Sequence, residues 1–151
     1  MSWIPCSGSE RVDGMVWVKR MAQKARRAQQ SRESGNDLMN GYLYGDNDFM
    51  DGSVLRFLGM SDAEFSADIC SEADDEAGIR RALANTSRSA AERLEFSTKM
   101  ERQLKSFPII DADEGRLPPG FRTSALKFFY NSLMMPIVYP VFRRAERKRR
   151  A

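Results

Sequence analysis

Two helix-start signals of the same type constrain the fold of this chain more than any other feature. Ser61 is followed three residues later by Glu64, and Ser89 is followed three residues later by Glu92. Each pair is a capping box, in which the two side chains satisfy backbone N–H groups that a helix start leaves without partners. The helices predicted from these signals are 61–71 and 89–104.

Apolar residues at helical spacing predict further helices along the chain. The predicted segments are 9–32, 51–58 and 74–84. Gly59 suits the left-handed end of the second of these, and Leu94, Met100 and Leu104 are expected on the buried face of the 89–104 helix. Since no β-type alternation of useful length is present, we predict an all-α, compact single-domain bundle of about five to seven helices.

The segments between these helices give the expected domain organisation. Glycine and asparagine crowd residues 35–52 together with Tyr42, Tyr44 and Phe49, which predicts an ordered Gly/Asp/Tyr loop after the first helix. Several prolines within 106–121 indicate that this segment is a connector. The expected parts are a helical domain over 1–122 with its core at 11–104 and its connector at 106–121, and an apolar helical arm with a basic tail over 123–151, packed on the same domain.

The absence of histidine limits the chemistry of this chain. It excludes Ser-His and Cys-His catalysis, histidine-ligated metals and an imidazole pH switch. Cys6 and Cys70 are too few for a cysteine zinc site and are expected as free thiols. We therefore expect no metal and no cofactor. The first residues do not resemble a secretory signal, so a cytoplasmic protein is expected.

Charge is strongly segregated along the chain. Residues 11–32 hold seven Lys or Arg against one Asp, residues 46–76 hold ten acidic residues against one Arg, and residues 116–151 hold nine Lys or Arg against one Glu. The favoured interpretation is that these blocks pair within the fold or are solvated, and the alternative is that each faces a separate partner.

The candidate ligand-binding residues lie in the first helix and in the loop that follows it. Arg20, Lys24 and Arg27 fall in one narrow sector of the helix, roughly opposite its apolar residues. They fit either a solvated helix face or a clamp for an anion. The loop contributes Tyr42, Tyr44 and Asp51 as candidates.

The C-terminal segment combines an apolar run with a basic tail. Its uncharged stretch, 128–142, is shorter than the ~20 residues that a membrane-spanning helix needs. The favoured interpretation is an arm that packs on the core, or on a second copy as a homodimer through 123–142. The alternative is an anionic membrane surface as partner, and nucleic acid is less favoured. The residues for membrane or polyanion contact are Arg143, Arg144, Arg147, Lys148, Arg149 and Arg150.

Two motifs carry a resemblance to a known family. They are Arg20-Met21-x-x-Lys24-Ala25-Arg26 and Phe57-Leu58-Gly59, separated by the Gly/Tyr/Asp loop. With their surroundings they resemble a small bacterial helical family catalogued only as a domain of unknown function, over about residues 11–104. Gln23 departs from the pattern, where an acidic residue is common. The resemblance implies a compact helical domain and a bacterial origin, and it implies no activity.

Three functions remain open from the sequence. The leading hypothesis is a non-catalytic binding or regulatory module for an anionic ligand or partner, because the candidate residues form charged surfaces and an aromatic loop. The first alternative is a small-molecule enzyme that uses Tyr, Asp and Lys at the junction of helix and loop. The second is a peripheral membrane protein anchored by residues 125–150, which would make the protein membrane-associated.

Overall fold

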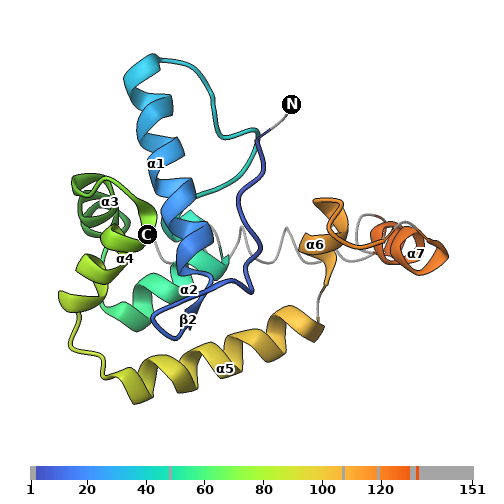
Figure 1. The fold of residues 1–151 in the computed structure, drawn as a ribbon. Helices are drawn as coiled ribbons and strands as arrows, with labels where there is room; N and C mark the ends of the chain where they lie inside the picture. The colour runs from blue at the N-terminus through green and yellow to red at the C-terminus, as the bar shows by residue number, and fades with distance from the viewer. Residues whose placement is uncertain (1–2, 48, 107, 119, 130–131, 133–151) are drawn as a thin grey trace, which may run out of the picture. The chain divides into compact units, whose positions relative to one another are not determined.

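A computed structural model describes residues 3–47, 49–106, 108–118, 120–129 and 132 of the chain. The chain divides into two compact units, Met1–Ser106 and Phe107–Ala151. The prediction of a helical fold is confirmed, since the described residues form seven α-helices and one two-stranded sheet (Figure 1). The predicted boundary at residue 122 and the packing of the 123–151 arm stay predictions, and the basic tail lies outside the described residues.

The first unit contains most of the fold. Its elements are β1 (Arg11–Val12), β2 (Met15–Val16), α1 (Val18–Ser34), the 3₁₀ helix η1 (Gly45–Asn47), α2 (Phe49–Leu58), α3 (Asp62–Ser71), α4 (Asp75–Ala84) and α5 (Ala90–Ser106). The second unit contains α6 (Ile109–Asp113), within the segment predicted as a connector, and α7 (Phe121–Phe129). None of the described helices is long and apolar enough to cross a membrane.

Both predicted capping boxes are confirmed. At the start of α3 the Ser61 hydroxyl accepts from the Glu64 N–H at 3.2 Å, and the Glu64 carboxylate accepts from the Ser61 N–H at 2.8 Å. Ser89 and Glu92 repeat this arrangement at the start of α5, with the same two distances. The backbone hydrogen bond from each serine lowers the pKa of its glutamate partner, because it favours the charged carboxylate.

The predicted first helix over 9–32 is wrong at its beginning. A hairpin occupies 11–16, with Arg11 opposite Val16 and Val12 opposite Met15. The turn between its strands is Asp13-Gly14, and both residues have positive φ, as a tight hairpin turn requires. This dipeptide is a strong hairpin signal, and the helical spacing of the neighbouring apolar residues obscured it.

The core of the first unit forms where α1 meets α3 and α4. Met21, Ala22 and Ala25 of α1 are fully buried, as are Phe65 and Ile69 of α3. The apolar stripe predicted along α1 therefore faces the core.

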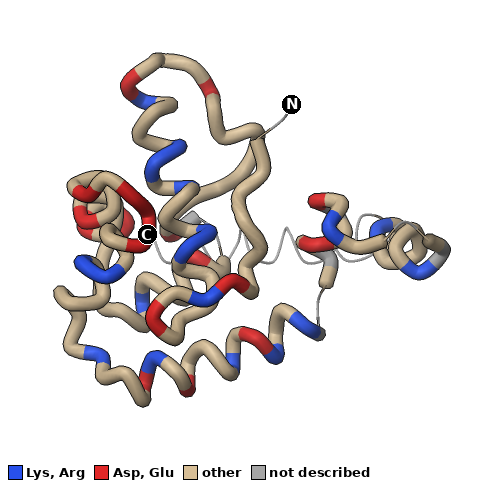
Figure 2. Tube along the Cα trace, viewed as in Figure 1, with Lys and Arg blue, Asp and Glu red and all other residues tan. Residues whose placement is uncertain are grey.

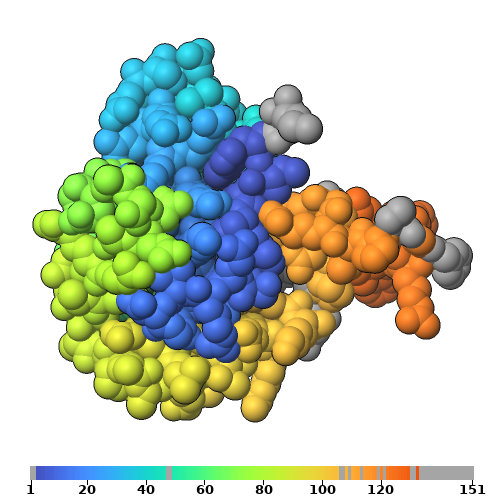
Figure 3. Space-filling model, viewed as in Figure 1, coloured from blue at the N-terminus to red at the C-terminus, as the bar shows by residue number. Residues whose placement is uncertain are grey.

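Helix α5 packs against the hairpin, as Figure 3 shows for the strands in blue and the helix in yellow. The Val16 N–H donates to the buried Ser97 hydroxyl at 3.2 Å, and Met100 is buried as predicted. The prediction for Leu94 is wrong, since 54% of this residue is exposed.

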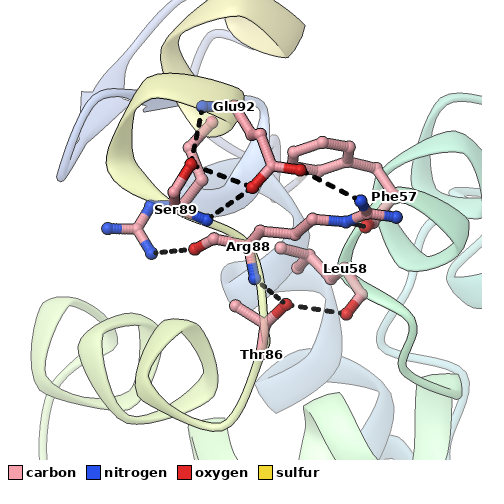
Figure 4. Close-up of polar contacts among 7 residues, drawn as sticks. Phe57, Leu58, Thr86, Arg88, Ser89 and Glu92 are labelled. Carbon is pink, nitrogen blue, oxygen red and sulfur yellow. Dashed lines mark hydrogen bonds and ion pairs between the residues drawn. The ribbon is translucent and has the colours of Figure 1, made fainter.

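The connection between α4 and α5 caps the C-terminal end of α2 (Figure 4). Arg88 Nε donates to the Phe57 carbonyl at 2.7 Å, and the Thr86 hydroxyl donates to the Leu58 carbonyl at 2.9 Å. The Arg88 guanidinium also lies over the Phe57 ring, 5.1 Å from its centroid, and contacts Glu92 at 3.2 Å. These bonds satisfy the last carbonyls of α2, which the helix itself leaves without donors.

Opposite charges pair across the first unit, as the favoured interpretation of the charge segregation requires. Arg26 of α1 contacts Asp75 of α4 at 2.7 Å, and Lys24 of α1 contacts Asp51 of α2 at 2.7 Å. Figure 2 shows a cluster of acidic residues, in red, around α3 and α4. The first basic block and the acidic block therefore neutralise each other in part within the fold.

Candidate functional site

A buried ion pair joins α1 to α2. Lys24 Nζ lies 2.7 Å from Asp51 Oδ1, and the two side chains are only 1% and 0% exposed. The indole N–H of Trp17 donates to the same oxygen at 2.7 Å, and the Gly45 N–H donates to the other carboxylate oxygen at 3.1 Å. Both oxygens of Asp51 therefore have donors, and its charge is compensated inside the core.

A series of contacts between cations and aromatic rings lies beside this pair. The Arg20 guanidinium lies over the ring of Trp17 and over the ring of Tyr42, 5.2 Å and 5.4 Å from their centroids. The Tyr42 ring meets Trp3 edge to face at 5.7 Å, and the Arg27 guanidinium lies over Trp3 at 5.5 Å. We call these five residues the aromatic ladder. The cation–π contacts of this ladder hold the N-terminal segment and the loop against α1.

The loop between α1 and η1 is held at several points. The Asn40 amide donates to the Trp3 carbonyl at 3.2 Å, close to the ladder. Farther along, the Tyr44 hydroxyl pairs with the Ser66 hydroxyl at 2.7 Å and donates to the Asp62 carbonyl at 3.1 Å. The loop is thereby attached to α1 on one side and to α3 on the other.

A groove of 640 Å³ lies between α1, this loop and α3. Its lining residues are Ala28, Gln29, Arg32, Met39, Tyr42, Leu43, Tyr44, Asp62, Ala63, Ser66 and Ala67. We call it the α1–α3 groove. Small alanines from the two helices, apolar and aromatic loop residues, and a few polar side chains are the mixture typical of small-molecule sites.

The α1–α3 groove contains one positive and one negative side chain. They are Arg32 from α1 and Asp62 from α3. Neither side chain forms an ion pair with another residue that the structure describes. The neighbouring Glu33 accepts a hydrogen bond from Gln29 at 2.7 Å.

The comparisons with known proteins give a family and no activity. The family model described as Domain of unknown function (DUF5069) matches residues 3–116. The chain belongs to the DUF5069 family. No curated protein and no solved structure matches it. The match to the DUF5069 model includes the aromatic ladder and every residue that lines the α1–α3 groove.

The interpretation of Arg20 and Lys24 as a solvated helix face is wrong for this DUF5069 chain. Arg20 is 3% exposed and Lys24 is 1% exposed. The N-terminal segment and the loop cover this side of α1, so its charges are enclosed by aromatic rings and by Asp51. Periodicity places residues on a helix face, but it does not reveal which other segment packs over that face.

The structure brings most of the candidate residues of the DUF5069 domain into one region. Arg20 and Arg27 belong to the ladder, Lys24 and Asp51 form the buried pair, and Tyr44 lines the groove. Tyr42 belongs to both the ladder and the groove and joins the two.

Four residues of this region were missed in the sequence analysis. They are Trp3, Trp17, Arg32 and Asp62. The two tryptophans are the only ones in the chain, and this was the signal available for them. Arg32 and Asp62 carry no local signal, because their importance arises from the packing of α1 against α3.

Replacing Tyr44 with phenylalanine is expected to lower the free energy of unfolding by about 1 kcal/mol at neutral pH, because Ser66 loses its partner. Burial raises the pKa of Tyr44 above its ordinary value of 10.0. The unfolded chain therefore loses this proton first, and wild-type stability falls as the pH rises above about 10. Urea unfolding of both proteins between about pH 9 and pH 11 measures the effect. An equally steep decline in the variant would contradict the assignment.

Proposed function

We propose that this DUF5069 protein is a non-catalytic binding module whose ligand is a small anionic organic molecule held in the α1–α3 groove. The main support is the groove itself. Its wall on the loop side is held in place by contacts to α1 and α3. Its volume of 640 Å³ lies in the range of small-molecule sites.

The loop wall supports binding because it is ordered before a ligand arrives. Tyr42 is fixed by Arg20 and Trp3, and Tyr44 is fixed by its hydrogen bonds to α3. A site whose walls are already in place loses little conformational entropy on binding. The aromatic ladder therefore serves the groove by positioning Tyr42.

Arg32 supports an anionic ligand. Its guanidinium lines the groove and forms no ion pair among the residues that the structure describes. A guanidinium offers a planar set of donors that matches a carboxylate or a phosphate. The ligand in this proposal places its negative group there and its apolar part against the alanines and Leu43.

The buried pair favours this proposal over the enzyme alternative. Lys24 and Asp51 bind each other at 2.7 Å inside the core, and neither lines the groove. These two groups are therefore poorly placed for proton transfer to or from a ligand in the groove. The membrane alternative rests mostly on residues outside the described part of the chain and stays a prediction.

The test uses the fluorescent anion anilinonaphthalenesulfonate, which combines an aromatic body with one negative group. Ala63→Leu fills the groove and is expected to weaken dye binding at least about tenfold, because the added side chain occupies the ligand volume. Arg32→Gln is expected to weaken it about threefold, the size typical of an exposed charge pair. Fluorescence titration of the full-length protein gives each dissociation constant.

Ala91→Leu on the outer face of α5 is the matched control, since Ala91 is exposed like Ala63 and lies outside the groove. Near-ultraviolet circular dichroism verifies that each variant keeps its tertiary packing. Unchanged dye affinity in both Ala63→Leu and Arg32→Gln would overturn the proposed site.

A further inference from the structure

We infer that this protein forms a symmetric dimer through an antiparallel contact between the α5 helices of two copies. The inference goes beyond the proposed ligand site, because no residue that lines the α1–α3 groove belongs to α5. It follows from a second groove, which lies along one face of α5. This helix, in yellow in Figure 1, runs along the edge of the first unit.

The second groove has a volume of 490 Å³, and among the residues that the structure describes only those of α5 line it. Its lining residues, which we call the α5 face, are Ala91, Leu94, Glu95, Thr98, Lys99 and Arg102. They follow one another at alternating steps of three and one, which is the spacing of one side of a helix. The buried residues Ser97 and Met100 do not belong to it. The α5 face is therefore a side of the helix that the described part of its own chain leaves open.

The α5 face has an apolar centre. Leu94 lies there with 54% of its surface exposed, and Ala91 adds a small side chain one turn before it. The Thr98 hydroxyl donates to the Leu94 carbonyl at 2.8 Å, so it has its acceptor within the helix. Contact with a second copy would thus remove apolar surface from water without leaving the Thr98 donor unsatisfied.

The charges of the α5 face are self-complementary when two copies run antiparallel. Along the face the acidic Glu95 comes first, and the basic Lys99 and Arg102 follow. In a parallel pair in register, each of these charges would meet its own copy. In an antiparallel pair with the two-fold axis between positions 95 and 99, each Glu95 meets the partner's Lys99. Opposite charges across a helix pair determine the orientation of the helices, so this pattern favours a second copy as the partner.

An ion pair within each helix prepares this arrangement. Lys99 Nζ lies 2.7 Å from Glu95 Oε1, and the two side chains are 69% and 68% exposed. Two such pairs related by a two-fold axis form a network of four charges, in which each carboxylate meets two ammonium groups. Because each charge already has a counter-charge in its own helix, the approach of the second copy leaves no member of these pairs alone.

The expected dimer is weak. Helix α5 has 17 residues, which corresponds to a length of ~25 Å. Two single helices of this length are expected to bury less than the ~1,200 Å² at which stable interfaces begin. We therefore expect a dissociation constant on the order of 100 µM.

Sedimentation equilibrium of the full-length protein, from about 10 µM to about 1 mM, tests the dimer by mass action. The mean mass of the wild-type protein is expected to rise from that of the monomer toward twice that value. Leu94→Asp is expected to remain monomeric, because it places a charge in the apolar centre. Glu95→Lys and Lys99→Glu are each expected to weaken the dimer about tenfold, since like charges then meet across the two-fold axis. The double variant with both charge reversals is expected to recover the wild-type affinity.

Glu76→Lys is the matched control for the charge reversals. It makes the same change of charge and also breaks an exposed ion pair within one helix, with Arg80 of α4 at 3.1 Å, but it lies outside the α5 face. Its dimer is expected to match that of the wild-type protein. A wild-type protein that is monomeric at about 1 mM would overturn the inference. A dimer that persists unchanged in Leu94→Asp and in both single charge reversals would also overturn it, because another surface, such as the 123–142 segment, would then join the copies.

Discussion

Replacing Asp51 with alanine is expected to lower the free energy of unfolding by about 3–5 kcal/mol, the effect typical of breaking a buried ion pair by removing one partner. The variant leaves the Lys24 ammonium group buried without its counter-charge. It also removes the acceptor for the Trp17 indole N–H and the Gly45 N–H. Urea unfolding followed by tryptophan fluorescence measures the change.

Two further variants test the physical reason. Asp46→Ala removes an exposed carboxylate from η1 and is expected to change stability by less than about 0.5 kcal/mol. The double variant Lys24→Met with Asp51→Leu is expected to recover part of the loss, because neither charge is then left alone in the core. If Asp51→Ala lowered the free energy of unfolding by less than about 1 kcal/mol, the buried pair would not be a main interaction between α1 and α2.

Replacing Gly78 with alanine is expected to destabilise the protein by about 1–3 kcal/mol through overpacking. A Cβ atom at this position of α4 would lie 2.7 Å from Cα and 2.9 Å from the carbonyl oxygen of Ile69 in α3. These are backbone atoms, so they move only if the two helices separate. Thermal and urea unfolding of the variant measure the loss.

Gly52→Ala is the matched control, because it is the same substitution inside another helix, α2. The nearest atom to its new Cβ is Nη1 of Arg56 at 3.1 Å, at the mobile end of an exposed side chain. This variant is expected to stabilise the protein by about 0.5–1 kcal/mol, the ordinary gain from alanine in a helix. The changes in stability caused by the two substitutions must have opposite signs. A neutral or stabilising Gly78→Ala would contradict close backbone packing of α3 on α4.

The candidate site could be predicted from the sequence only in part. Tyr42 and Tyr44 were identified because aromatic residues in a glycine-rich loop need a partner surface, and both line the groove. Arg20 and Lys24 were identified by their position on α1, but their burial was not foreseen. Arg32 was not distinguished from the other basic residues, because a groove between two helices depends on side chains far apart in sequence.

Features that depend on a few neighbouring residues could be predicted from the sequence alone. Ser61 and Glu64 specify the start of α3 within one turn, and Gly59 ends α2 with φ of 70° as predicted. The burial and ion pairing of Lys24 depend on tertiary packing, because its partner Asp51 lies 27 positions away. A buried charge is stable only where the folded chain brings a counter-charge to it, and no local pattern contains that information.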